Sequence, residues 1–440
     1  MMEMSSPVQS VYVFILGKNW KLSLAELVSF LEVRRCEFRI GNLSKSFAAI
    51  SSQEDLDPSL IDDLGGTIKI GKVVSSIPAK TVEDAFLRRN KQAQTEIKAN
   101  LSKDRATEKI FRLPLEKCVF GVSLYFESPR FLRCSREMQR FVGSYFKEEL
   151  IAEGAKAKFM GFPRNRRLPQ LTHVEVLKKG LIEKSAEILF CIGREQATIA
   201  RTIAVHNPFE FQKRDVGRPV QRKIFSIPPR LAKIMVNLSL CAPGKVLLDP
   251  FCGVGTILQE AMLAKAQVAG MDMNPWCVKA SCTNLEWLKK EYGLKDAKYR
   301  VLLGDSSHLS SKIDEKSVDC IVTEPDLGPP LRHFPTEHYA RGIVDKLNPL
   351  YYAFFEEAYK VLMGKGRMVL VTPYIKTRSG SFVSMDIDEK AVTVGFRIIR
   401  PFERKNFEDT SLIGDLTETS SFIDIGERHK VGREIHILRK

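Results

Sequence analysis

The sequence contains no uninterrupted apolar run of the ~18–20 residues that a membrane-spanning helix requires. Its N-terminal segment also lacks a basic stretch followed by a long apolar one, which is the pattern of a secretory signal. Neither insertion into a membrane nor export is indicated. We therefore expect a cytoplasmic protein without a membrane partner.

Cysteines are few and scattered. The chain has nine of them, an odd number, and no C-x-x-C pair or Cys/His cluster occurs. A disulfide framework and a zinc site are therefore not expected, and we predict no metal. The histidines His173, His206 and His308 lack partners at metal-ligand spacing, so we expect an ordinary hydrogen-bonded role for each.

Two glycine-rich motifs that bind nucleotide phosphates are also missing. No G-x-x-x-x-G-K-[ST] sequence occurs, which excludes a P-loop. The pair Gly253 and Gly255 would need a third glycine at position 258 to complete the dinucleotide fingerprint, but that residue is Leu258. Nicotinamide cofactors are therefore disfavoured.

The composition is that of a soluble globular protein with a basic balance. Of its 440 residues, 44% are hydrophobic and 28% are charged, and this length predicts two or three domains. The formal net charge is +15, and residues 1–220 carry 36 Lys and Arg against 26 Asp and Glu. This uneven excess favours a polyanionic partner, nucleic acid in particular, over a merely solvated surface.

Periodicity and composition divide the chain into segments. The first has a strand at residues 11–16, a helix near 22–33 and a turn at Gly65-Gly66 into another strand, which predicts a small α+β domain. The polar residues 81–110 are either a solvated helix or a connector. Charge, proline and glycine mark a linker that includes Asn207-Pro208-Phe209. The predicted parts are 1–80, 81–206, the linker 207–226, and 227–440.

A positively charged helix is predicted after Pro129. Its apolar residues, among them Met138 and Tyr145, share one face of a helical wheel, and basic residues cluster on the opposite face. Residues 130–184 hold 13 Lys and Arg against 6 Asp and Glu. Like charges repel unless a partner neutralises them, so nucleic acid is favoured over a solvated face. The predicted contacts are Arg133, Arg136, Arg140, Lys147, Arg164, Arg166 and Arg167.

The last segment begins with a strand–loop–helix unit. The short apolar run 246–248 is typical of a buried parallel strand, and Asp249 closes it. Gly253 and Gly255 then allow a tight turn and the close approach of a ligand before a helix at 257–264. Ligands of open α/β sheets bind beyond the carboxyl ends of the strands. An acid in this place suits a ligand that ends in a cationic amino acid.

Two further strands end in acids. The strand at 268–272 ends in Asp272, whose spacing from Asp249 suits an acid that binds both ribose hydroxyls. The strand at 299–305 ends in Asp305, which is placed to reach an adenine edge. Each acid has the alternative of being a plain helix N-cap. Three in succession favour a cofactor site in a Rossmann-like α/β sheet.

The fourth strand, residues 318–323, leads into Glu324-Pro325-Asp326-Leu327-Gly328. Here the chain resembles the THUMP-containing RNA guanine-N2 methyltransferases, whose fourth motif is [D/N/S]-P-P-[Y/F]. The segment Asp249–Thr256 is similar to their D-P-[F/M]-x-G-x-G-T cofactor motif. Looser similarities occur at 17–27, 171–176 and 205–215. The resemblance covers most of the chain.

The resemblance implies an α/β fold with a Rossmann-like class I methyltransferase domain, preceded by α+β ferredoxin-like and THUMP domains. It implies an S-adenosylmethionine-dependent tRNA methyltransferase acting on the exocyclic N2 of a guanosine, with position ten as the target. The partner is then tRNA, and a small activating protein subunit is left open. The cofactor-binding residues are Asp249, Pro250, Phe251, Gly253, Gly255, Thr256, Asp272, Met273, Asp305 and Ser306.

The motif at 324–327 departs from the family pattern. An aromatic-ring amine is a weak nucleophile, so an acid and a proline carbonyl accept hydrogen bonds from it, while the motif's aromatic stacks on the base. Glu324 and Pro325 keep the two acceptors. Asp326 adds a charge, and Leu327 removes the aromatic. All four are the predicted catalytic residues, and the candidates for a substitute platform are His333, Phe334 and Tyr374.

Two alternative functions stay open. The lost aromatic favours an RNA-binding protein or subunit of the same architecture without turnover, whereas the complete set of cofactor acids favours an enzyme. Adenine-N6 methylation follows from the same motif chemistry but leaves the basic N-terminal half unexplained.

Overall fold

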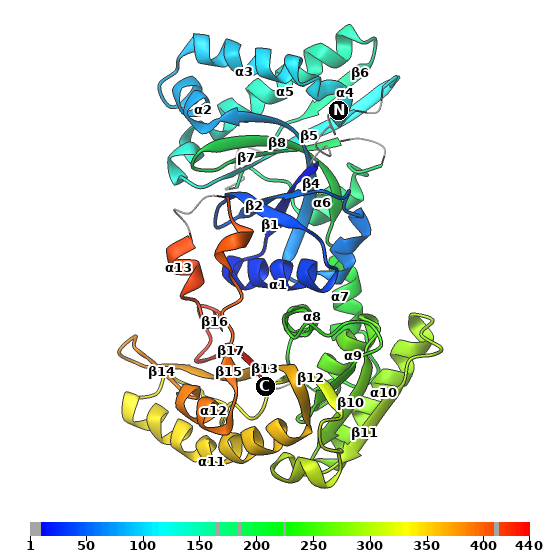
Figure 1. Ribbon diagram of the computed structural model, residues 1–440. Helices are drawn as coiled ribbons and strands as arrows, with labels where there is room; N and C mark the ends of the chain where they lie inside the picture. Colours follow the sequence, from blue (N-terminus) through cyan, green and yellow to red (C-terminus); the bar gives the residue numbers. More distant parts are fainter. Residues whose placement is uncertain (1–9, 112, 163–167, 184–185, 223–225, 409–412) are drawn as a thin grey trace, which may run out of the picture.

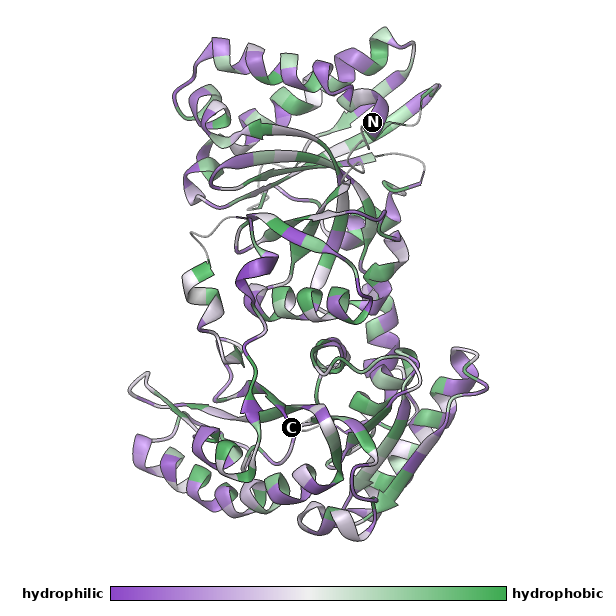
Figure 2. Cartoon of the chain, in the orientation of Figure 1, coloured by the Kyte–Doolittle hydropathy of each residue, from purple (hydrophilic) through white to green (hydrophobic). Residues whose placement is uncertain are grey.

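Figure 1 shows the computed structural model of the chain, in which two bodies built around sheets lie one above the other. The structure describes residues 10–111, 113–162, 168–183, 186–222, 226–408 and 413–440. The upper body contains an eight-stranded sheet from residues 10–205, and the lower body a nine-stranded sheet from residues 246–439. Figure 2 shows hydrophobic colour on the strands of the lower sheet and hydrophilic colour along the outer helices.

The first part of the upper sheet is antiparallel, in the order β2-β3-β1-β4. Helix α1 begins after Asn19, whose side chain accepts a hydrogen bond from the Leu22 amide. The strand predicted at 11–16 and the helix predicted near 22–33 are confirmed. The elements are β1 (Ser10–Leu16), α1 (Trp20–Val33), β2 (Phe38–Leu43), β3 (Phe47–Ser52), the 3-10 helix η1 (Pro58–Asp63) and β4 (Thr67–Pro78).

Strands from both sides of the predicted boundary at residue 80 belong to one sheet, because β4 pairs with β8. Residues 81–110 are largely helical and bury Ala93, Ile97 and Leu101, so of the two alternatives the helix holds. The elements are α2 (Ala79–Phe86), α3 (Lys91–Lys103), α4 (Ala106–Ile110), β5 (Lys117–Phe126), η2 (Pro129–Cys134), α5 (Ser135–Ala152), β6 (Lys156–Met160), α6 (His173–Lys178), β7 (Ala186–Ile192) and β8 (Gln196–Val205).

The segment between the two sheets carries a helix, α7 (Pro208–Asp215). Asn207 caps it by accepting a hydrogen bond from the Phe209 amide, which accounts for Asn207-Pro208-Phe209 without any catalytic role. The buried Arg214 donates to Glu260 over 2.6 Å. The segment is therefore fastened to the lower body by an ion pair.

The lower sheet has the order β11-β10-β9-β12-β13-β17-β15. The strands from β11 to β13 are parallel, whereas β17 is antiparallel to β13. The order reverses between β9 and β12, and such a switch point leaves a crevice at the carboxyl ends of the strands. The first elements are α8 (Pro229–Leu238), β9 (Val246–Asp249), α9 (Thr256–Leu263), β10 (Gln267–Asp272), α10 (Pro275–Glu291), β11 (Tyr299–Leu303), η3 (Ser306–Ser311) and β12 (Val318–Thr323).

The sequence-predicted strands of this sheet are confirmed. The sequence alone favours a helix at 348–363 and a strand at 367–371 as the next crossover of this fold. The helix is longer than that, because it begins eleven residues earlier at Glu337, where Thr336 caps it. The strand expected at 367–371 also extends in both directions. The remaining elements are α11 (Glu337–Val361), β13 (Leu362–Lys376), β14 (Phe382–Ser384), α12 (Asp388–Val394), β15 (Arg397–Ile398), η4 (Arg404–Asn406), α13 (Ile413–Thr417), β16 (Ser421–Asp424) and β17 (Val431–Arg439).

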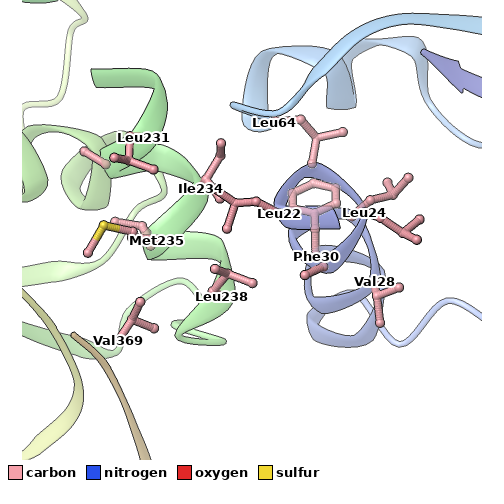
Figure 3. Packing of buried hydrophobic residues seen from close by; sticks show 14 of the residues in the cluster. Leu22, Leu24, Val28, Phe30, Leu64, Leu231, Ile234, Met235, Leu238 and Val369 are labelled. Atoms are coloured by element: carbon pink, nitrogen blue, oxygen red, sulfur yellow. The ribbon is translucent and has the colours of Figure 1, made fainter. Parts of the chain in front are cut away.

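Helices α1 and α8 join the two bodies through one apolar core. Figure 3 shows Leu22 of α1 and Ile234 of α8 pointing toward each other between the helices. Beside this contact the buried carboxylate of Glu26 accepts hydrogen bonds from the amides of Gly65 and Gly66 and from Asn237 of α8. Burial raises the pKa of Glu26. The junction is therefore both apolar and hydrogen-bonded.

The chain also returns from the lower body to the upper one before its last strand. Phe407 bridges to Ile40 of β2, and the Glu408 amide donates to the Ile40 carbonyl. Asn19 donates to the carbonyl of Ile423 in β16. In Figure 1 this segment rises beside α1 and β2 in orange and red. The two bodies are thus connected both through α8 and through the segment that includes Phe407, Glu408 and Ile423.

Candidate active site

A cavity of about 960 Å³ lies at the switch point of the lower sheet. Its walls come from the loops after β9, β10 and β12 and from the N-terminal half of α11. Residues Asp249, Phe251, Gly253, Thr256, Asp272, Met273 and all of 324–330 line it. The predicted cofactor loop and the predicted catalytic motif therefore face the same space.

Asp249 is the most deeply buried acid of this cavity, with 1% of its surface exposed. Its carboxylate accepts hydrogen bonds from Thr323 Oγ1 over 2.7 Å and from the Phe251 amide over 3.2 Å. Burial raises the pKa of Asp249 to about 7, and these hydrogen bonds only partly offset the effect. A buried carboxylate of this kind favours a cationic ligand.

The turn after Asp249 leaves room for a ligand. Gly253 has a φ of +52°, which favours glycine, and a Cβ atom built there would meet nothing within 4 Å. Gly255 has a φ of +86° and lies against Ser281, so its requirement comes from packing at the start of α9. Of the two glycines, Gly253 is the one that opens toward the cavity.

Asp272 organises the neighbouring loop. One carboxylate oxygen accepts from the Gly253 amide over 2.9 Å and the other from the Asn274 amide over 2.8 Å. Met273 follows with 76% of its surface exposed although it lines the cavity. A large apolar side chain that is exposed at a cavity is typical of a surface that a ligand covers.

Four of the predicted cofactor residues do not line the cavity: Pro250, Gly255, Asp305 and Ser306. Asp305 caps η3, and the hydrogen bond from the Ser307 amide lowers the pKa of Asp305. The amide of its neighbour Gly304 donates to the carbonyl of Asp272, which lines the cavity, so Asp305 lies next to the cavity but not in its wall. The structure thus gives Asp305 an N-cap role.

Glu324 has a partner that the sequence did not reveal. Arg433 of β17 donates from Nε to Glu324 Oε2 over 2.6 Å and from Nη2 to Oε1 over 3.2 Å. Burial lowers the pKa of Arg433, but the charge of Glu324 and its hydrogen bonds outweigh burial and raise the pKa above its ordinary value. The two residues are 109 positions apart, so no local pattern marks the pair.

The other motif residues take different orientations. Pro325 is buried. Asp326 is exposed at the cavity and accepts from the Gly328 amide over 3.0 Å, while its carbonyl oxygen lies 3.0 Å from the hydroxyl of Tyr351. Leu327 is only 9% exposed and belongs to the core, although one side of it lines the cavity. The motif thus presents one ion-paired carboxylate and one exposed carboxylate.

The expected substitutes for the missing aromatic lie elsewhere. Tyr374 stacks on Phe382 with ring centroids 4.7 Å apart, and Phe334 lies against Lys376. Neither these two nor His333 lines the cavity. His338 and Tyr339, at the start of α11, do line it. Sequence reasoning missed them because it began the helix eleven residues too late.

The basic stripe lies in the other body. Arg133 on η2 and Arg136, Arg140 and Lys147 on α5 are all exposed, whereas Met138, Val142 and Tyr145 are buried. Figure 1 places α5 in the upper body, whereas β10 and β12, whose following loops line the cavity, lie in the lower body. The remaining predicted contacts, Arg164, Arg166 and Arg167, lie outside the described residues.

No described helix combines the length and the low charge of a membrane span. Within the same residues, no group of three or more His, Cys, Asp or Glu side chains is arranged to hold a metal ion.

Comparison with known proteins points to the lower body. A family described as RMKL-like, methyltransferase domain, matches residues 218–396. The chain is 31% identical over 196 residues to a tRNA (guanine(10)-N2)-dimethyltransferase of Pyrococcus abyssi, which is 44% of this chain and 51% of that protein. It is 34% identical over 179 residues to the protein of the same name from Methanothermobacter thermautotrophicus, with shares of 40% and 47%. The chain spans about half the length of these curated relatives.

A solved structure extends the likeness of the fold to the whole chain. The crystal structure of TrmN from Thermus thermophilus has a TM-score of 0.51 at 15% identity and covers 98% of this chain and 99% of that one. At this identity the likeness shows the fold alone. With the strand order above, it defines the lower body as a Rossmann-like class I methyltransferase fold. Residues 218–396, which match the RMKL-like methyltransferase family, make up most of this body.

Proposed function

We propose that this protein transfers a methyl group from S-adenosylmethionine to the exocyclic N2 of a guanosine in tRNA, with position ten as the favoured target. The observation that carries the proposal is the single cavity in which Asp249 and Asp272 face the motif 324–327. The two relatives, each matched over about half of its length, have names that describe the same reaction.

The chain's own residues fit the cofactor. Asp249 is a buried carboxylate with a raised pKa and, in the described part of the chain, no ion-pair partner, so it suits the α-ammonium group. Gly253 leaves open space at the turn, and Asp272 suits the ribose hydroxyls. The bound cofactor would supply an electrophilic methyl group on a sulfonium. Isothermal titration tests this fit, and Asp272→Ala should weaken binding by ~1–3 kcal/mol.

The motif would hold the amine of the base. A carboxylate oxygen can accept more than one hydrogen bond, so Glu324 can accept from the amine while Arg433 holds it in place. The Pro325 carbonyl is the second acceptor. These fixed acceptors concentrate electron density on the nitrogen as it attacks the methyl group. Arg433 is thus a positioning residue for Glu324.

The upper body would bind the rest of the tRNA. We propose that residues 1–80 form a ferredoxin-like domain and 81–206 a THUMP domain, joined by the segment 207–226 to the methyltransferase domain 227–440. The exposed face of Arg133, Arg136, Arg140 and Lys147 would contact phosphates. A cytoplasmic location and a small activating subunit belong to the same proposal.

A methyl-transfer assay with purified protein tests the reaction. An unmodified tRNA transcript should accept labelled methyl groups, and digestion should yield N2-methylated guanosine. The matched control carries inosine at position ten, which removes only the exocyclic amine. Equal labelling of the inosine transcript would show that position ten is not the target. No labelling of any tRNA would contradict the reaction.

One observation favours the alternative of an RNA-binding protein without turnover. Glu324 is held by Arg433 in an ion pair, and Leu327 is packed into the core rather than presenting a ring to the cavity. Such a protein would bind tRNA and S-adenosylmethionine and transfer no methyl group.

A further inference from the structure

The first turns of α11 form a continuous wall of the cavity. Tyr339, Gly342, Ile343 and Lys346 all line it, and their spacing of three and four residues places them on one helix face. This face adjoins the catalytic motif, because a Cβ atom built on Gly328 would lie 2.7 Å from Ile343. The wall therefore begins where the motif ends.

Gly342 is a glycine that the protein's own packing does not require. A Cβ atom built there would meet no heavy atom within 4 Å, and its φ is not in the left-handed region. Glycine in a helix interior is less stable than alanine. Because Gly342 lines the cavity, the open space beside it belongs to whatever the cavity holds. A missing side chain at this place allows a flat group to lie against the helix.

Tyr339 supplies an aromatic ring one turn before this opening. Its surface is 55% exposed although it lines the cavity. In the described part of the chain no other ring or cation packs on it, in contrast to Tyr374 on Phe382 and to Phe251, whose ring meets Phe354 edge-on. An exposed ring with a free face is suited to stack on a base.

Lys346 lies seven residues after Tyr339, about 10 Å farther along the helix axis. It is exposed at the cavity and carries a positive charge on a long, flexible side chain. The face thus offers a ring, then a gap, then a cation. This is the order of groups that a nucleotide needs, with a base to be stacked and a phosphate to be neutralised.

We infer that Tyr339, Gly342 and Lys346 hold the nucleotide that carries the target amine, so that Tyr339 replaces the aromatic lost at Leu327. The inference rests on the proposed function and names the residues that recognise its substrate. Tyr339 stacks on the extruded base, Gly342 leaves room for the base, and Lys346 pairs with a phosphate.

Steady-state methylation of tRNA by five variants tests the inference. Tyr339→Ala should lower kcat/KM about 5- to 150-fold, the range typical of one stacked base, and Tyr339→Phe should retain activity because only the ring is needed. Lys346→Gln should raise KM for tRNA and leave kcat unchanged. The affinity for S-adenosylmethionine should stay within twofold in all of them. Arg341→Ala, on the same helix but outside the cavity, is the matched control and should change nothing.

Gly342→Ala gives the sharpest result because its two effects have opposite signs. The added methyl group should raise or maintain Tm, as helix propensity dictates, and yet lower kcat/KM for tRNA. Unchanged activity in both Gly342→Ala and Tyr339→Ala would overturn the inference. An equal loss of S-adenosylmethionine affinity in Tyr339→Ala would also overturn it, since the ring would then belong to the cofactor site.

A binding measurement separates this inference from the proposed function. Guanosine 5′-monophosphate is titrated into protein saturated with S-adenosylhomocysteine and followed by NMR. Weaker binding to Tyr339→Ala than to wild type supports the wall even if no tRNA is methylated. If the substitution leaves binding unchanged, or if the wild type does not bind, the result contradicts the role of Tyr339 in holding the nucleotide, even if tRNA is methylated.

Discussion

The two bodies each bury a carboxylate, and the two carboxylates are treated in opposite ways. Glu187 in the upper sheet accepts from Lys69 and Ser123 on one oxygen and from Thr202 on the other. Asp249 in the lower sheet has a hydroxyl and an amide as donors, and no described cation pairs with it. The first charge is neutralised within the fold. The second has no described cation and, unlike the buried Glu26 of the junction, it lines the cavity, where a cationic ligand can reach it.

The largest effect should come from breaking the buried ion pair between Lys69 and Glu187. Lys69→Met leaves the buried Glu187 without its cation, which should lower the free energy of unfolding by about 3–5 kcal/mol. The double variant Lys69→Met/Glu187→Leu should recover much of this loss. Denaturant unfolding measures both. If Lys69→Met were as stable as the wild type, the charge of Glu187 would not depend on Lys69 for its neutralisation.

The next effect concerns the motif carboxylates. Glu324→Gln keeps the shape but removes the charge that offsets positive charge on the attacking nitrogen, which should cost ~2.7–4 kcal/mol, or about 100- to 1,000-fold in kcat. S-adenosylmethionine affinity should barely change. Asp326→Asn is the matched control, with a smaller loss expected. The reverse result would move the acceptor to Asp326 and leave Glu324 and Arg433 as a structural ion pair.

A smaller effect is a pH dependence from Asp249. The pKa of Asp249 in the folded protein, about 7, lies above the ordinary value of 3.8. The stability that this group contributes is therefore fully present below pH 3.8 and is lost as the pH rises through about 7. Cofactor binding has the opposite sign, because the ionised form attracts the ammonium. Affinity for S-adenosylmethionine should therefore rise about fivefold between about pH 6 and about pH 7.

Titration calorimetry of the wild type and of Asp249→Asn across this range checks the pH dependence. The variant should bind more weakly and show a flat profile. A wild-type profile as flat as that of the variant would mean that Asp249 is already ionised, as a closed structural charge would be.

The smallest effect concerns the exposed charges of the upper body. Neutralising Arg136 and Arg140 together should flatten the slope of log affinity for tRNA against log salt by about one to two units. Cofactor binding in the lower body should not change. An unaltered slope would show that the stripe is only a solvated face.

Local patterns predicted the lower sheet well. The runs before Asp249 and Asp272 are apolar, short and closed by an acid, and both were found as strands that end at the cavity. Asp305 shows the limit of this reasoning, since the same pattern there produces an N-cap outside the cavity. All three acids accept a hydrogen bond from a backbone amide, and only the three-dimensional structure shows which of them also face the cavity.

Long-range pairing could not be read from the sequence. Arg433 reaches Glu324 because β17 returns antiparallel beside β13, and the bridge from Phe407 to Ile40 joins residues more than 350 positions apart. The pairing of β4 with β8, which makes one sheet of the upper body, is also nonlocal. Tyr339 and Gly342 were missed for a local reason, because polar and charged residues around them hid the start of α11.

Mass spectrometry of tRNA nucleosides from cells with and without this protein tests the central claim most directly. The account predicts that N2-methylated guanosine at position ten is present with the protein and absent without it. It further predicts that the Glu324→Gln protein, expressed at the wild-type level, does not restore the modification. Identical nucleoside profiles in the presence and absence of the protein would contradict the account, and the open carboxylates of the lower body would then serve binding without methyl transfer.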